Sequence, residues 1–310
     1  MMQNNITKVI IFLFVVTMGL SSCSDDWASV GTDEEATVSF VFKTDEENDS
    51  SKAESRASSS DKTIKDAAVF IFNQHGEIIG YGEASSNVTS LKVVTRKNDK
   101  CTVYAVANTK QFESSLGLSK IASKSAFDKV FYKVLNSAGT PDIANVMFAK
   151  KENFSTTSST CSLLLNKLYS DFSFSIKIEK DKQTGLNIVL DSYQLCHLPK
   201  SVNISGTYQS SDYYDDKAVS FTSNNESGQT KTFTEQIYTN PLPKGTNDNS
   251  KGWGYRSSKY APANASYLKI KAHSQMWETT FYYYLGGLDL PSTYSASADY
   301  TNYTIYPSKS

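Results

Sequence analysis

Short segments in which apolar and polar side chains alternate recur along most of the chain. In Thr37–Lys43, Val38, Phe40 and Phe42 point to one side and their neighbours to the other, and the same period of two recurs in Phe172–Glu179. This is the pattern of a strand that buries one face. The body is also rich in Tyr, Thr, Val, Ile and Ser, which favours strands over helices. Many short strands joined by polar turns are typical of β-sandwiches.

The same reasoning predicts strands through both halves of the chain, which join near Leu165–Ser175. Between the early strands, the apolar spacing over Phe112–Leu135 changes to that of one or two short helices. The chain is therefore predicted to be all-β with a few short helices. The further strands are predicted over Ala67–Phe72, Glu77–Tyr81, Ser90–Val94, Lys100–Asn108, Met147–Ala149, Cys161–Leu165, Leu186–Leu195, Pro199–Gly206, Phe233–Tyr238, Tyr267–Ala272, Met276–Leu285 and Tyr300–Tyr306.

The N-terminus carries a nearly unbroken apolar run, Val9–Leu20, behind Lys8. A membrane-spanning helix needs about 20 apolar residues, so this run has the length of a signal-peptide core instead. It ends in Leu20-Ser21-Ser22-Cys23, which resembles a bacterial lipobox. We therefore predict a lipoprotein signal peptide over residues 1–22 and lipidation of Cys23. The alternative is an ordinary signal peptide beside a coincidental cysteine.

An acidic and serine-rich linker follows the first predicted strand. The residues from Asp45 to Asp61 carry almost no apolar side chains, so the segment cannot offset the entropy of ordering. Arg56 lies in the middle of this linker, followed by Ala57. Exposed loop segments of this kind are preferred sites of proteolysis, so Arg56–Ala57 is the candidate processing site.

No pattern of catalytic or metal-binding residues stands out. The formal net charge is −1, which does not favour a nucleic-acid partner. The three histidines are widely separated, and no metal-ligand, phosphate-loop or nucleophile motif occurs. Besides Cys23, the chain has Cys101, Cys161 and Cys196, which either are buried free thiols or include one disulfide. We expect no metal, no cofactor and no enzymatic activity.

The second half is rich in aromatic residues, which leaves two interpretations open. Aromatic side chains pack well in a β-sandwich core, and this is the first interpretation. They can also form a surface on which sugar rings stack. The residues in question are Trp253, Tyr255, Trp277, Phe281 and Tyr282.

Several segments, taken in chain order, resemble one protein family. They are Thr37–Lys43, Val69–Asn73 with Gly76, Tyr104–Asn108, Leu163–Ile178, and Tyr283–Gly286 followed by Asp299–Ile305. Behind a lipobox-like cysteine, this ordered set resembles the Bacteroidales fimbrillins, the FimA- and Mfa-type subunits of type V pili. Asn166-Lys167 and Ala298-Asp299 stand where family members often carry an arginine, so the subfamily is left open.

The resemblance implies two transthyretin-like β-sandwich domains. It also implies export as a lipoprotein to the surface of the outer membrane, followed by cleavage after Arg56 by an arginine-specific protease. Loss of the first strand, with Val38, Phe40 and Phe42, would open a hydrophobic groove that a neighbouring subunit's C-terminal strand fills. The candidate donor strand contains Tyr300, Asn302, Tyr303, Thr304, Ile305 and Tyr306.

We therefore predict an acidic tether over residues 23–35, an N-terminal domain over 36–167 and a C-terminal domain over 168–310. The predicted function is that of a structural, accessory or anchor subunit of a surface pilus. Its partners would be other pilus subunits, the outer membrane through the lipid, and host or bacterial surface ligands, with no nucleic acid. Two alternatives stay open: a first strand that is never removed, as in anchor subunits, and a non-polymerising lipoprotein that binds glycan or matrix.

Overall fold

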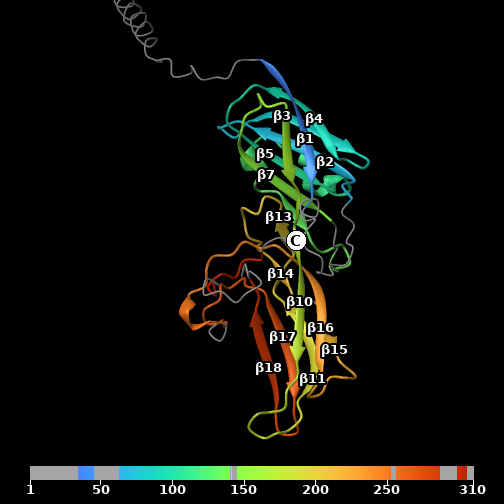
Figure 1. The fold of residues 1–310 in the computed structure, drawn as a ribbon, viewed down its shortest axis with the longest axis vertical. Helices are drawn as coiled ribbons and strands as arrows, with labels where there is room; N and C mark the ends of the chain where they lie inside the picture. The colour runs from blue at the N-terminus through green and yellow to red at the C-terminus, as the bar shows by residue number, and fades with distance from the viewer. Residues whose placement is uncertain are drawn as a thin grey trace, which may run out of the picture.

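The structure is a computed structural model that describes residues 34–44, 63–139, 141, 145–252, 256–286 and 299–305. Cys23, Arg56, Ala57 and Tyr306 lie outside the described residues. Strands dominate the described chain, and the helices are single turns. The predicted all-β fold with a few short helices is therefore confirmed. The molecule is long, with an upper group of strands that includes β1–β5 and a lower group that includes β10 and β15–β18 (Figure 1).

The elements follow the predicted segments closely. The short helices are η2 (Lys110–Phe112), α2 (Glu113–Leu116), η3 (Leu118–Lys120), α3 (Lys124–Phe127) and η4 (Asn249–Lys251). The strands are β1 (Glu35–Lys43), β2 (Asp66–Phe72), β3 (Ile78–Ser85), β4 (Ser90–Arg96), β5 (Cys101–Ala107), β6 (Phe131–Lys133), β7 (Met147–Phe154), β8 (Thr160–Leu164), β9 (Asn166–Lys167), β10 (Tyr169–Lys177), β11 (Val189–Cys196), β12 (Leu198–Pro199), β13 (Ser201–Asn203), β14 (Tyr213–Tyr214), β15 (Val219–Ser220), β16 (Thr230–Tyr238), β17 (Tyr267–His273) and β18 (Glu278–Tyr284).

The upper strands form one eight-stranded sheet in the order β8-β1-β4-β3-β2-β5-β7-β9. Its two edge strands, β8 and β9, are separated in the chain by Leu165 alone. The two edges must therefore lie next to each other, so the sheet curls around its own core. That core contains Val38, Phe40 and Phe42 of β1 together with buried side chains of β2, β4, β5, β7 and β8.

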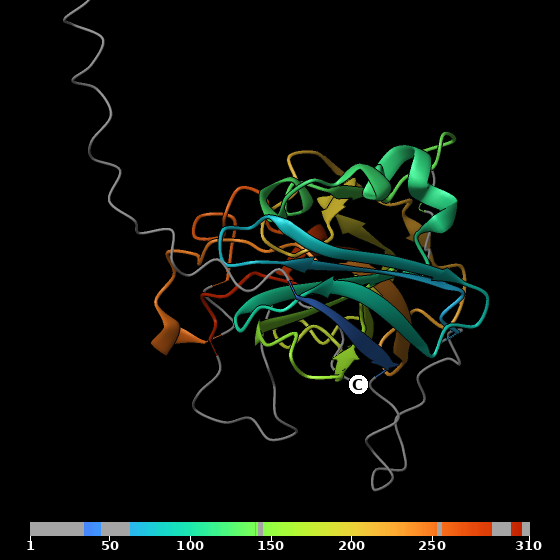
Figure 2. The same cartoon turned by 90° about the horizontal axis from the view of Figure 1, so that it is seen from above.

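The strands β2 and β5 are buried on both faces. In β2, Val69 and Ile71 point into the core of the curled sheet, whereas Phe70 and Phe72 point to the other side. There they pack with Phe127 of α3 and with residues of the second half of the chain. Figure 2 shows the short helices on one side of the sheet and β1 on the other. Burial of both faces explains why β2 reads as a continuous apolar run.

The lower strands form a smaller sandwich. The pair β10–β16 packs against a four-stranded sheet in the order β15-β11-β17-β18. Leu190, Leu195, Leu268 and Ile270 of the larger sheet form its core with Ile237 of β16. The alternation predicted for Phe172–Glu179 is the reason that β10 can present one face to this core.

The two groups of strands share part of a core. Leu168, Tyr169, Val202, Ile204 and Tyr238 come from the second half but pack with the outer face of β2 and β5. The strand β13 also pairs antiparallel with β6. The domain boundaries predicted from the sequence stay a prediction.

Two sequence-based expectations are wrong. The helical spacing does not continue through Phe131–Lys133, which forms β6, because β13 offers it a strand partner. The strand expected over Tyr300–Tyr306 is not formed in its described part. Residues Tyr300 and Thr301 make a turn, and Ile305 makes a single bridge to Asn240. Side-chain contacts fix this segment instead of the hydrogen bonds of a strand ladder.

Asn108 provides a test of the upper sheet. It has a positive φ of 60°, and its buried amide donates to the carbonyl oxygens of Thr63 (3.2 Å) and Asn145 (2.8 Å). A carboxylate cannot donate, so Asn108→Asp should lower the free energy of unfolding by about 1–3 kcal/mol, measured by urea denaturation. The control is Asn224→Asp, because Asn224 has a similar φ of 51° but is exposed. Equal effects at both positions would contradict the assigned role.

Candidate assembly site

The first strand, β1, lies inside the sheet rather than at its edge. It pairs antiparallel with β4, from Glu35 opposite Arg96 to Val41 opposite Ser90. On its other side it pairs parallel with β8, from Ser39 opposite Thr160 to Lys43 opposite Leu164. Both backbone edges of β1 are therefore hydrogen-bonded, although no other strand precedes it among the described residues.

The side chains of β1 divide between core and solvent as the sequence predicts. Val38 and Phe42 are buried, and Phe40 is 0% exposed, whereas Val41 is 37% exposed. The Phe40 ring lies 6.2 Å from that of Phe154, centroid to centroid. Burial of the three apolar side chains contributes about 5 kcal/mol or more before ordering costs. Removal of β1 would leave β4 and β8 with unpaired edges beside an open apolar slot.

The two ends of β1 connect to segments outside the described residues. On the N-terminal side lie residues 1–33, which include Cys23, and on the C-terminal side lie residues 45–62, which include Arg56 and Ala57. Cys23, Arg56 and Ala57 thus lie outside the described residues, in the segments that precede and follow β1 in the chain.

The candidate donor segment is packed onto the lower half of the molecule. Tyr303, Thr304 and Ile305 are buried, whereas Tyr300 and Asn302 are partly exposed. The amide of Ile305 donates to the carbonyl oxygen of Asn240 (3.3 Å), and the amide of Asn240 donates back to that of Ile305 (3.1 Å). The segment is thus held by its own chain. Sequence reasoning expected two alternating faces and missed the burial of Thr304.

A cavity of about 540 Å³ lies beside the C-terminal segment. Its wall includes Leu163 and Leu164 of β8, which is the parallel neighbour of β1, and Thr304 and Ile305 of the C-terminal segment. The rest of the wall comes from β7, β8, β9, the end of β13 and the loops after β9, β13 and β16. The strand next to β1 and the candidate donor segment therefore line the same cavity, although no residue of β1 does. The sequence carries no signal for this proximity.

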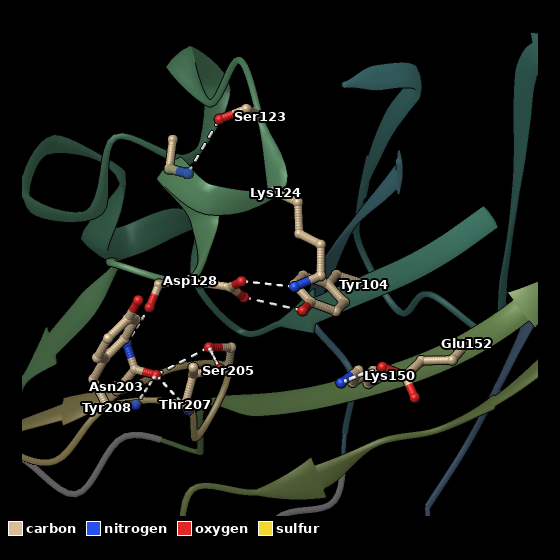
Figure 3. A network of polar contacts seen from close by, with 11 residues as sticks. Tyr104, Ser123, Lys124, Asp128, Lys150, Glu152, Asn203, Ser205, Thr207 and Tyr208 are labelled. Atoms are coloured by element: carbon tan, nitrogen blue, oxygen red, sulfur yellow. Dashed lines mark hydrogen bonds and ion pairs between the residues drawn. The ribbon is translucent and has the colours of Figure 1, made fainter. Parts of the chain in front are cut away.

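A polar network next to this region ties the helices to both halves of the chain (Figure 3). The carboxylate of Asp128 accepts from the Tyr104 hydroxyl (3.0 Å) and from Lys124 Nζ (2.7 Å). The amide of Asn203 donates to the carbonyl oxygens of Asp128 (2.8 Å) and Val130 (3.1 Å). Burial raises the pKa of Tyr104 to about 12, so its hydroxyl stays protonated and donates. The network fits a structural role, because each group is bound to another protein group.

The three described cysteines are free and buried. Of the two interpretations from the sequence, buried thiols are thus confirmed and a disulfide among them is wrong. Burial raises the pKa of Cys101 and Cys196 to about 11, and it also raises the pKa of Cys161. Thiolates are the reactive form, so all three should be inert while the fold is closed. Cys161 lies directly opposite Phe40 in the β1–β8 pairing.

Two other features are absent from the described part of the chain. Within it, no group of three or more His, Cys, Asp and Glu side chains could hold a metal ion. None of its helices is long and apolar enough to cross a membrane. The strand β1, the C-terminal segment and the cavity lined by β8 and that segment form the candidate site.

Phe40 and Val41 are matched probes of β1, because they are neighbours that face opposite ways. Phe40→Ala should lower the free energy of unfolding by about 3–5 kcal/mol, since it leaves a cavity in the core. Val41→Ala should change it by less than about 1 kcal/mol, because Val41 is partly exposed. Urea denaturation of the full chain measures both. A small effect of Phe40→Ala would mean that β1 contributes little to the closed fold.

Comparison with known proteins agrees with this architecture. The family model of the major fimbrial subunit protein FimA matches residues 36–171, from β1 into the start of β10. No curated protein sequence matches the chain. The tip fimbrial protein Mfa3 from Porphyromonas gingivalis, C-terminally truncated, has a similar fold, with a TM-score of 0.52, 13% identity, and coverage of 88% of this chain and 92% of that one.

A fimbrilin (FimA) from Porphyromonas gingivalis W83 is similar at a TM-score of 0.51 and 13% identity, covering 89% of this chain and 88% of its own. At 13% identity, the likeness to these two structures shows the fold alone. The family model adds the sequence signature of β1 and the sheet around it. The match over residues 36–171 supports the resemblance to the Bacteroidales fimbrillins.

Proposed function

We propose that this protein is a surface pilus subunit that is exported as a lipoprotein on Cys23 and assembled by donor-strand exchange. One observation carries the proposal. The first strand, β1, fills the place between β4 and β8, and it is the strand that a cut at Arg56 would detach from the rest of the chain. The match to the fimbrial family model supports the fimbrial role, and the position of β1 supports the mechanism.

The physical basis is the pairing of β1 on both sides. Once β1 leaves, β4 and β8 have unpaired amide and carbonyl groups, and the core is open where Val38, Phe40 and Phe42 were. An incoming strand can restore both ladders and fill the three positions with its alternate side chains. The slot therefore favours an occupant that resembles β1 in alternation and not in exact sequence.

The C-terminal segment of a neighbouring copy is the proposed occupant. It contains Tyr300, Asn302, Tyr303, Thr304, Ile305 and Tyr306. In its own chain this segment makes a single bridge through Ile305, so its described backbone is not already committed to a ladder. Release costs side-chain contacts, and insertion into the slot would supply a full set of strand hydrogen bonds. In an anchor subunit, by contrast, β1 would stay in place.

The proposal is tested by cutting the full chain with an arginine-specific protease. The expected result is release of the segment up to Arg56 and formation of oligomers that resist mild SDS. At low protein concentration the open slot should persist, and Cys161 should react with a maleimide at least about tenfold faster than before cleavage, because local opening governs its access. Mass spectrometry locates the label.

Two controls make this result specific. Cys196 lies in the lower half, away from β1, so its labelling rate should not change. Arg56→Ala should prevent release, Cys161 labelling and oligomer formation together. Oligomers that form equally well with Arg56→Ala would contradict cleavage as the trigger. An uncut Arg56 in the wild-type protein would identify a permanent first strand.

A second candidate, a glycan- or matrix-binding surface, is favoured by exposed aromatic residues on β18. Phe281, Tyr282 and Tyr283 are exposed, Tyr282 at 54%. Tyr267 lies beside Tyr282 and Tyr284, with ring centroids 5.8 and 5.3 Å apart, so the outer face carries a row of rings. Trp277 is instead bound to Asp181 (3.0 Å), and Trp253 and Tyr255 lie outside the described residues.

This candidate predicts binding that depends on the aromatic row. On a glycan array, Tyr282→Ala should abolish the signal, because sugar rings stack on exposed aromatic faces. Val219→Ala is the control, since Val219 is also exposed but lies on β15 at the other edge of the same sheet. No signal from the wild-type protein, or an equal loss in both variants, would reject a glycan surface on β18.

A further inference from the structure

The side chain of Arg256 donates hydrogen bonds to two segments of the chain. Its Nη1 donates to the carbonyl oxygens of Tyr300 (3.0 Å) and Asn302 (2.9 Å). Its Nη2 donates to those of Leu285 (2.8 Å) and Tyr284 (3.3 Å). One guanidinium therefore joins the end of β18 to residues 299–305, which are the described part of the C-terminal segment.

The same guanidinium packs on the aromatic ring of that segment. Arg256 is 6% exposed, and its Cζ lies 4.1 Å from the centre of the Tyr303 ring. A cation over the face of an aromatic ring is attracted by the ring's electron density, more strongly when water is excluded. Burying a charge is costly unless its donors are bound. The contact is therefore effective only while the segment stays in place.

The surroundings are shaped for Tyr303. Its ring is fully buried, and its hydroxyl donates to Asn247 Oδ1 (3.1 Å). Two glycines make room for it. A Cβ added to Gly245 would lie 2.4 Å from Tyr303 Cε2, and one added to Gly286 would lie 2.4 Å from Tyr303 Cα. No real Cβ approaches so closely, so any other residue at these positions would push the segment outward.

The backbone of the segment is bound mainly by side chains, those of Arg256, Asn247 and Asn249, and makes few hydrogen bonds to other backbone groups. Ile305 makes a bridge to Asn240, and the carbonyl oxygen of Thr301 accepts from the Gly245 amide (2.7 Å). Thr304 binds Leu242 through its side-chain hydroxyl. A segment fastened in this way can open without disrupting a sheet, because local opening breaks few cooperative contacts.

We propose that Arg256 is a positioning residue that fixes the C-terminal segment onto its own chain. The effect on assembly rests on the proposed function: a segment that Arg256 holds on its own chain is not available to a neighbouring copy. Arginine suits this role since its planar fork reaches several carbonyl oxygens at once, whereas lysine offers a single point charge. Asn247 and the two glycines define which side chain fits, and Arg256 sets how firmly the segment is held.

The test is hydrogen–deuterium exchange of the full, uncleaved chain, read by mass spectrometry. In Arg256→Gln, peptides covering residues 299–305 should exchange at least about tenfold faster, because opening governs exchange. Peptides from β11 and β17 should keep the wild-type rate. Arg256→Lys should restore only part of the protection. Lys244→Gln is the matched control, because Lys244 pairs with Asp299 (2.7 Å) at the surface and exposed ion pairs contribute little.

Two results would overturn the proposal. One is unchanged exchange of residues 299–305 in Arg256→Gln. The other is faster exchange throughout β11 and β17, which would make Arg256 a support of the whole lower sheet. Gly286→Ala gives an independent check with Arg256 intact. It should release the same segment by steric contact with Tyr303, and protection that survives this change would contradict the described packing.

A separate readout distinguishes this inference from the proposed function. After cleavage at Arg56, Arg256→Gln should form SDS-resistant oligomers several-fold faster than the wild type. Faster exchange of residues 299–305 with an unchanged assembly rate would support the role of Arg256 and overturn the donor role of the segment. Unchanged exchange of residues 299–305 with normal assembly would overturn the role of Arg256 and leave the donor role of the segment standing.

Discussion

The pairing of β1 with β4 on one side and β8 on the other is the interaction on which the upper half depends. It fills the place between β8 and β4 in the strand order of the curled sheet, and it brings Val38, Phe40 and Phe42 into the core. A strand in this position is usually permanent, because its removal exposes two edges and an apolar slot at once. Here the strand is also the first in the described chain and is joined to the rest through residues 45–62.

The C-terminal segment presents the complementary arrangement. Its residues Tyr303–Ile305 are buried, its described part forms no ladder, and many of its contacts involve the side chains of Arg256, Asn247 and Thr304. A ladder opens as a cooperative unit, whereas a few side-chain contacts can be lost locally. We therefore infer that the molecule combines a strand that is costly to remove with a segment that is easier to release, and β8, the neighbour of β1, lines the same cavity as Ile305.

Much of the fold could be predicted because strands have a period of two. Alternation located β1, β4, β10 and β17 to within a few residues, and the change of period located the short helices. The prediction failed where a partner decided the outcome. Phe131–Lys133 became a strand because β13 lies beside it, and Tyr303 is held in an irregular segment by Arg256 and two glycines. These contacts join residues far apart in the sequence, so no local pattern predicts them.

The sequence by itself determined the strand content, the buried face of β1, the lipobox-like cysteine and the polar composition of the residues around Arg56, because each depends on neighbouring residues. Only the tertiary structure decided that β1 lies inside the sheet, that Cys161 lies opposite Phe40, and that Arg256 binds the C-terminal segment. The physical reason is that strand order and side-chain packing depend on long-range contacts. A period of two specifies which face of a strand is buried, but it does not specify the strands on either side.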